Sequence, residues 1–181
     1  ANMLQAEAWF KPALAELDPK EPTVFICALP LYHIFAFTVN MMLSMRTGGK
    51  SILIPNPRDL PAVLKELSRH TFHSLPAVNT LFNALVNHPD FDTVDWSNLK
   101  VSLGGGTAVQ EAVSRLWQQK TGCTICEGYG LSETSPSTSC NPVDSTAYTG
   151  NIGVPIPSTW MKVVDDEGRD LPVGEVGELC I

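Results

Sequence analysis

The residues best suited to chemistry lie in one short segment, Glu127–Pro136, which reads EGYGLSETSP. Within it Gly128 and Gly130 flank Tyr129, and glycines let a backbone turn sharply or approach a ligand closely. Tyr129 presents a flat face that can stack on a nucleobase. A core aromatic at a strand end is the alternative, but flanking glycines would then serve no purpose. The start of this segment therefore predicts a nucleotide site.

The same segment continues with two hydroxyls around a carboxylate: Ser132, Glu133 and Thr134. A carboxylate is a hard oxygen ligand of the kind that Mg²⁺ prefers. The alternatives are a surface role for Glu133 and a turn-capping role for Thr134. Beside an aromatic that can hold a base, the three residues favour a nucleoside triphosphate with its metal ion.

A second glycine run supports this interpretation. Gly104, Gly105 and Gly106 follow a strand-like stretch at Lys100–Leu103, and such a turn allows close approach by a flat or anionic group. Thr107 and Gln110 have the spacing of a capping box, which predicts a helix that begins at Thr107.

Three segments together resemble one enzyme family. EGYGLSETSP is similar to the adenine-and-magnesium motif of the adenylate-forming enzymes, which include acyl-CoA synthetases, luciferases and peptide-synthetase adenylation domains. Leu103–Gln110 (LGGGTAVQ) resembles the small-residue turn that precedes that motif, and Ala28–Phe35 (ALPLYHIF) resembles the aromatic and histidine motif beside the acyl pocket. The similarity extends over essentially all 181 residues and looks most like the bacterial long-chain fatty-acid–CoA ligases. The family usually has Thr before the glutamate, where this chain has Ser132, so the hydroxyl is kept.

The resemblance implies a two-step reaction: a fatty acid and ATP form acyl-AMP and pyrophosphate, and coenzyme A then displaces AMP. It implies catalytic roles for Ser132, Glu133 and Thr134, with Glu133 as the Mg²⁺ ligand. It further implies ATP/AMP contacts for Gly104, Gly105, Gly106, Thr107, Glu127, Gly128, Tyr129 and Gly130, and places in the acyl pocket for His33 and Phe35.

A histidine such as His33, taken alone, is more often a core residue with its hydrogen bonds satisfied than part of a binding site. Phe35, Phe37 and Met41 have helical spacing, which favours core packing, with room for one or two of them to line an acyl tunnel.

Other expected parts of the family are not found in this chain, namely the phosphate loop, the ribose-binding Asp, the hinge and the catalytic Lys. The resemblance thus implies an internal piece of the large N-terminal domain of an enzyme, inactive alone. The alternatives are another acyl or aryl acid–CoA ligase or adenylation domain, and a non-catalytic nucleotide-binding domain.

Hydrophobic periodicity predicts the fold class. Apolar or β-branched runs at 23–29, 51–54, 71–75, 100–103 and 124–127 alternate with helical stripes, which predicts an α/β fold with a largely parallel sheet and helices on both faces. Ligands then belong at the carboxyl ends of the strands. Residues 1–140 are expected to form this α/β subdomain. Residues 141–181 are expected to form a linker and the first strands of a β-rich subdomain.

Composition narrows the function classes further. The chain is 44% apolar and 17% charged, with a net charge of −7, which argues against a nucleic-acid partner because phosphate contacts need clustered Lys and Arg. The five cysteines are scattered, which favours a reduced, cytoplasmic protein, and Cys123–Cys126 reads better as two buried side chains than as a zinc or redox pair. Peripheral contact with the inner membrane face and a homodimer are left open.

Overall fold

The computed structural model describes residues 1–181 and is built on one seven-stranded sheet. The strand order is β2-β1-β3-β4-β5-β6-β7, with the first five strands parallel and the last two antiparallel. The strands are β1 (Val24–Cys27), β2 (Lys50–Leu53), β3 (Ser74–Ala77), β4 (Val101–Gly104), β5 (Ile125–Gly130), β6 (Ser137–Cys140) and β7 (Val154–Pro155). The predicted α/β fold with a largely parallel sheet is confirmed.

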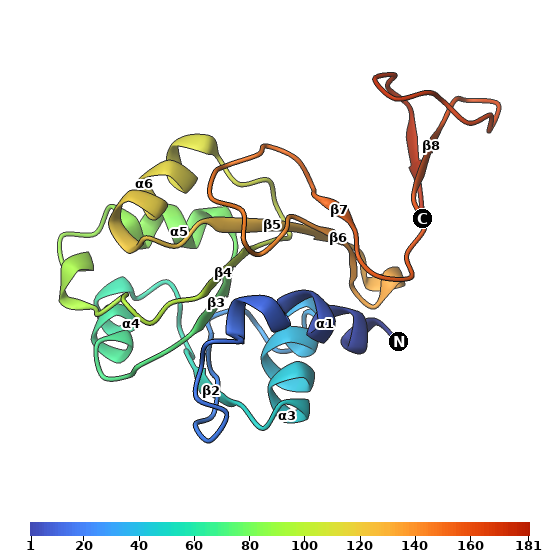
Figure 1. Cartoon of the computed structure of the whole chain (residues 1–181). Coiled ribbons are helices and arrows are strands. Elements are labelled where there is room, and N and C mark those ends of the chain that lie inside the picture. The colour runs from blue at the N-terminus through green and yellow to red at the C-terminus, as the bar shows by residue number, and fades with distance from the viewer.

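Helices cover both faces of this sheet (Figure 1). On one face lie α1 (Asn2–Leu14) and a continuous helical stretch made of α2 (Ile34–Ala36), the π-helix η1 (Phe37–Leu43) and α3 (Ser44–Arg46). On the other face lie α4 (Leu60–Leu67), α5 (Asn79–Val86) and α6 (Glu111–Thr121), with the short 3₁₀ turn η2 (Phe91–Thr93). Because successive strand residues point to opposite faces, Phe25 joins the core under α1 whereas Ile26 joins the core under α4 to α6.

The larger core is closed by an aromatic cluster. Trp96 stacks on Phe91 with ring centroids 4.6 Å apart, and Trp117 packs edge-on against both rings. Trp117 is fully buried, and its indole N–H donates to Ser102 Oγ at 2.9 Å. This buried polar tip is satisfied, so the cluster can fix α6 against β4 without an unpaired donor.

Two local predictions are wrong. Helix α6 begins at Glu111, and Gln110 is its N-cap without a side-chain bond. The Gln110 N–H is instead bound by Asn79 Oδ1 at 3.0 Å, which replaces the capping box expected from Thr107. The strand expected at 71–75 lies at Ser74–Ala77. Strand β5 includes both Gly128 and Gly130, and its pairing register shifts between Tyr129 and Gly130.

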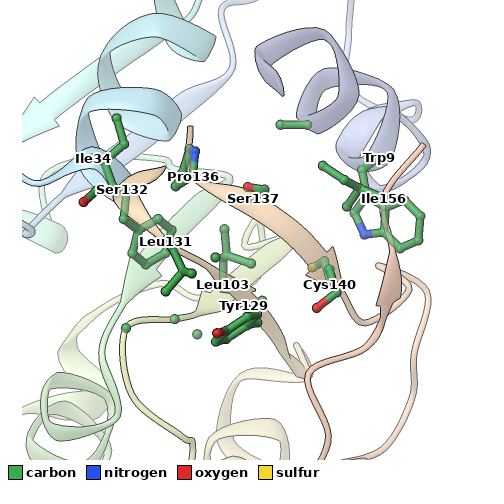
Figure 2. A pocket seen from close by; sticks show the side chains of 18 of the residues that line it. Trp9, Ile34, Leu103, Tyr129, Leu131, Ser132, Pro136, Ser137, Cys140 and Ile156 are labelled. Atoms are coloured by element: carbon green, nitrogen blue, oxygen red, sulfur yellow. The ribbon is translucent and has the colours of Figure 1, made fainter. Parts of the chain in front are cut away.

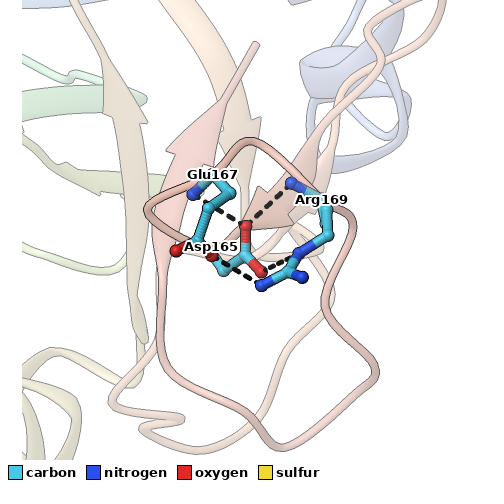
Figure 3. Close-up of polar contacts among 3 residues, drawn as sticks. All are labelled: Asp165, Glu167 and Arg169. Carbon is cyan, nitrogen blue, oxygen red and sulfur yellow. Dashed lines mark hydrogen bonds and ion pairs between the residues drawn. The ribbon is translucent and has the colours of Figure 1, made fainter.

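The last part of the chain forms a separate two-stranded antiparallel sheet that projects from the main body (Figure 1). It consists of β8 (Lys162–Val164) and β9 (Glu178–Cys180). After β8 the Asp165 carboxylate accepts the backbone N–H groups of Glu167 and Arg169 and pairs with the Arg169 side chain (Figure 3). Strand β7 pairs with β6, so part of the expected linker returns to the main sheet. The boundary at 140 and 141 stays a prediction.

The helices of this chain are all too short, or too polar, to cross a bilayer.

Candidate active site

A cavity of about 320 Å³ opens at the carboxyl ends of β4 and β5. Most of the predicted site residues line it: His33, Phe35, Gly104, Gly105, Gly106, Gly128, Tyr129, Gly130, Ser132 and Glu133. Figure 2 shows Leu131 and Ser132 at one end of the close-up, Trp9 and Ile156 at the other, and Leu103 and Tyr129 between them. The structure thus brings these residues together, while their individual roles stay predictions.

The glycine turn after β4 is shaped by the chain's own side chains. A Cβ on Gly104 would lie 2.6 Å from Val109 Cγ2, and one on Gly105 would lie 3.1 Å from Phe35 Cε1. Gly106 has a φ of +76°, which favours glycine. The space beside Gly105 that a ligand was expected to approach is therefore partly occupied by Phe35. Its ring lies over Gly105 and forms a wall of the cavity.

Tyr129 is held in the cavity by the pairing of β5 with β6, whose register shifts between Tyr129 and Gly130. It lies opposite Ser139 in the β5–β6 pair, and its carbonyl accepts the Thr138 hydroxyl at 3.0 Å. The side chain is half-buried. A ring fixed by its strand and open on one side is suited to stacking against a planar ligand.

The segment that follows, η3 (Ser132–Thr134), presents the hydroxyl and the carboxylate. Both Ser132 and Glu133 are exposed at the rim of the cavity. Thr134 does not line the cavity. Its hydroxyl oxygen accepts the Leu131 N–H at 2.9 Å, and its hydroxyl donates to the Pro136 carbonyl. These bonds correspond to the turn-capping alternative.

Glu127 and Thr107 also lie outside the lining of the cavity. Glu127 is half-buried, and burial raises the pKa of its carboxyl, partly offset by a hydrogen bond from the Val109 N–H. Its Oε1 atom is buried without a hydrogen-bond partner in the chain. Thr107 is exposed. The ATP contacts expected of these two side chains remain predictions.

Several cavity residues were missed by sequence reasoning. They are mainly apolar and come from α1, from β4 and β6, and from the position after β7: Ala6, Trp9, Phe10, Leu103, Cys140 and Ile156. Nothing in a helical stripe distinguishes a residue that packs in a core from one that faces a cavity. They give one end of the cavity an apolar wall, while Ser132 and Glu133 give it a polar rim.

The residues fit a magnesium ion that is shared with phosphates. The structure contains no cluster of three or more His, Cys, Asp or Glu side chains, and Glu133 takes part in none of the ion pairs. Mg²⁺ is commonly bound through one or two carboxylates together with substrate phosphates and water. A single unpaired carboxylate at the rim matches that mode better than a closed protein cage.

A second cavity of about 610 Å³ adjoins the first. The two share His33, Phe35 and Gly106 as lining residues, and Arg58 lies in the wall of the second. The His33 side chain accepts the Phe35 N–H through Nδ1 at 3.2 Å and so caps the helical stretch that starts at Ile34. His33 and Phe35 therefore stand where the two cavities meet.

Comparison with known proteins identifies the family of this chain. The long-chain-fatty-acid–CoA ligase of Yersinia pestis is 49% identical over all 181 residues, and that of Haemophilus influenzae is 45% identical over 180 residues. The chain spans about a third (32%) of each of these relatives. The ATP-bound structure of MatB from Rhodopseudomonas palustris superposes with a TM-score of 0.83 at 26% identity, over 98% of this chain and 33% of MatB. The family model described as AMP-binding enzyme matches residues 1–181, and the chain therefore belongs to the AMP-binding enzyme family.

Proposed function

We propose that this chain supplies the adenylating site of a long-chain-fatty-acid–CoA ligase. The observation that carries the proposal is one cavity with an aromatic ring, a carboxylate rim and an apolar end, formed by Tyr129, Glu133 and the side chains around Phe10. Relatives that are 45 to 49% identical bear that ligase's name. The complete polypeptide, rather than this segment alone, would carry the activity.

The first step is the transfer of AMP to the fatty acid. A carboxylate oxygen attacks the α-phosphorus of ATP, and the bond to pyrophosphate breaks. Tyr129 would stack on adenine, and the Ser132 hydroxyl would donate to a phosphate oxygen. Magnesium, bound by Glu133 and the phosphates, would offset the negative charge that develops on the leaving group.

The second step forms the thioester. The coenzyme A thiol releases its proton to solvent water, its sulfur attacks the acyl-AMP carbonyl carbon, and AMP leaves. The second cavity offers the thiol a separate approach to that carbon past His33 and Phe35. We assign these two residues to positioning the acyl group, with no proton transfer at His33.

A substrate panel on the complete polypeptide tests the proposal. Palmitate should give AMP and palmitoyl-CoA in equal amounts when ATP, Mg²⁺ and coenzyme A are present. Benzoate and anthranilate test the aryl acid alternative, since an anthranilate CoA ligase is among the similar structures (TM-score 0.83, 26% identity). Aryl-CoA as the main product would contradict the fatty acid assignment, and no acyl-AMP from any acid would favour a non-catalytic nucleotide-binding domain.

A further inference from the structure

We propose that the loop of residues 141–153, here called the strap, holds the Glu127 carboxylate in place for the nucleotide, and that Tyr148 is its positioning residue. The strap connects β6 to β7 and passes beside α6, where the Gln118 side-chain amide donates to the Thr146 carbonyl (Figure 1). This inference rests on the proposed function, because it takes the ligand next to Glu127 to be ATP.

Asn141 ties both ends of the strap to β5. It is 4% exposed, and its backbone N–H and its Nδ2 both donate to the Glu127 carbonyl, at 2.9 and 3.4 Å. Nδ2 also donates to the Asn151 carbonyl at 3.0 Å, and Oδ1 accepts the Thr149 hydroxyl at 3.0 Å. One buried side chain thus closes the strap onto the residue whose carboxylate it is proposed to position.

Tyr148 binds the strap to the segment that leads into α6. Its hydroxyl donates to the Val109 carbonyl at 3.0 Å. Its ring lies against the strap itself, since a Cβ on Gly150 would lie 3.3 Å from Tyr148 Cε1. Desolvation, followed by the negative charges of Glu127 and Glu111, raises the pKa of Tyr148 above its usual 10. The hydroxyl therefore keeps its proton and remains a donor at neutral pH.

Val109 lies between Tyr148 and the Glu127 carboxylate. It is buried, and it packs so closely on Gly104, the sheet partner of Glu127, that a Cβ on Gly104 would lie 2.6 Å from Val109 Cγ2. Burial raises the pKa of the Glu127 carboxyl, and the Val109 N–H, which donates to it, lowers that pKa in part. The bond from Tyr148 therefore fixes the backbone against which the carboxylate rests.

The carboxylate has an oxygen, Oε1, that is buried without a partner, and a buried acceptor of this kind destabilises a protein until a donor reaches it. Glu127 lies beside the first cavity, because its sheet partner Gly104 and the next residue, Gly128, both line that cavity. Glu127 and Tyr129 point to the same face of β5, as alternate strand residues do. A base stacked on Tyr129 that carries an amino group, as adenine does, offers a donor. The terminal torsion of a glutamate is soft, so the carboxylate keeps one orientation toward that donor only if its neighbours hold it.

The first test removes the Tyr148 hydroxyl in the complete polypeptide. Tyr148→Phe keeps the ring and loses only the bond to Val109. The KM for ATP should rise about fivefold, as expected for the loss of one hydrogen bond, while kcat and the KM for palmitate should stay within about twofold of wild type. Thr146→Val is the matched control, because Thr146 is an exposed residue of the strap of which only the carbonyl is hydrogen-bonded. Its KM for ATP should match that of wild type.

A double-mutant cycle shows whether Tyr148 acts through Glu127. Glu127→Gln keeps the size of the side chain, and its amide oxygen can still accept the Val109 N–H, but its NH₂ group then offers the nucleotide a donor in place of an acceptor. The KM for ATP should therefore rise. In that background Tyr148→Phe should add less than about a twofold increase, because residues of one network are not additive. Increases that multiply would show that Tyr148 acts independently of Glu127 and would overturn the inference.

Amide hydrogen exchange measures the link to Val109 without relying on activity. In Tyr148→Phe the amides of residues 107–110 should exchange about fivefold faster than in wild type, and Thr146→Val should leave their exchange unchanged. Wild-type exchange at these residues, or a wild-type KM for ATP, in Tyr148→Phe would overturn the inference and leave the ligase assignment intact. Wild-type protein that forms no acyl-AMP from palmitate would instead overturn the proposed function, and this inference with it.

Discussion

Gly130 and Pro136 approach each other so closely that no side chain fits between them. A Cβ built on Gly130 would lie 1.9 Å from the Pro136 carbonyl oxygen. That oxygen accepts the Leu131 N–H at 3.0 Å, so the contact closes the turn that carries Ser132 and Glu133. Position 130, next to the candidate active site, therefore requires glycine, because the backbone at Pro136 leaves no room for a side chain.

Gly130→Ala should therefore destabilise the fold and distort this turn. Overpacking costs up to about 3 kcal/mol, which corresponds to a fall in melting temperature of roughly 10 °C for a chain of this size. Gly128→Ala is the control, because its Cβ would meet its nearest atoms at 3.6 Å or more. Equal melting temperatures for the two variants would show that the close approach is not rigid.

His73 makes the stability of the sheet depend on pH. Its Nδ1 accepts the Val24 N–H at 2.9 Å, and burial, with a smaller contribution from Lys100, lowers its pKa below the usual 6.5. Because the unfolded chain takes up this proton at higher pH than the folded chain, the stabilisation is complete above about pH 6.5 and is lost as the pH falls through and below that value.

Denaturant unfolding of wild type between pH 5 and 8 should show this loss. The variant His73→Asn should show a smaller change of unfolding free energy with pH. The Asn amide oxygen can accept the Val24 N–H but does not titrate near neutral pH. If His73→Asn kept the pH dependence of the wild-type unfolding free energy, His73 would be excluded as the cause of that dependence.

Tyr129 should contribute to ATP affinity through its ring. Tyr129→Ala in the complete polypeptide should raise KM for ATP about tenfold, since stacking on a base contributes about 1–3 kcal/mol. It should raise KM for the fatty acid much less, and Tyr129→Phe should behave like wild type. Equal increases for both substrates would point to a damaged cavity instead.

The buried cysteines should be unreactive. Burial raises the pKa of both Cys126 and Cys140 to about 12, so hardly any thiolate is present at pH 8. A thiol reagent should label Cys180, which is half-buried, before the other four. Rapid labelling of Cys126 in the folded chain would reopen a redox role for the Cys123–Cys126 pair.

The sequence was most informative where one pattern has one physical solution. Alternating β and helical runs are compatible with few layouts other than a covered parallel sheet, and the Tyr129 segment lies at the strand ends as expected. The helix start expected at Thr107 was wrong because Asn79, which is distant in sequence, binds the Gln110 N–H that the Thr107 hydroxyl would have bound in a capping box. The π-helix and the apolar wall at Phe10 depend on packing between α1 and residues 34–46. This packing cannot be predicted from a local sequence pattern.

The central claim is that Glu133 holds magnesium at an adenylating site. ATP–pyrophosphate exchange with palmitate, followed against Mg²⁺ concentration in the complete polypeptide, tests it most directly. Glu133→Gln should lower the exchange rate by about tenfold or more, a loss of about 1.4 kcal/mol of transition-state stabilisation, and should require more Mg²⁺ for half-maximal rate. Glu16→Gln, an exposed carboxylate outside the cavity, should match wild type. A wild-type rate and an unchanged Mg²⁺ dependence in Glu133→Gln would contradict the claim.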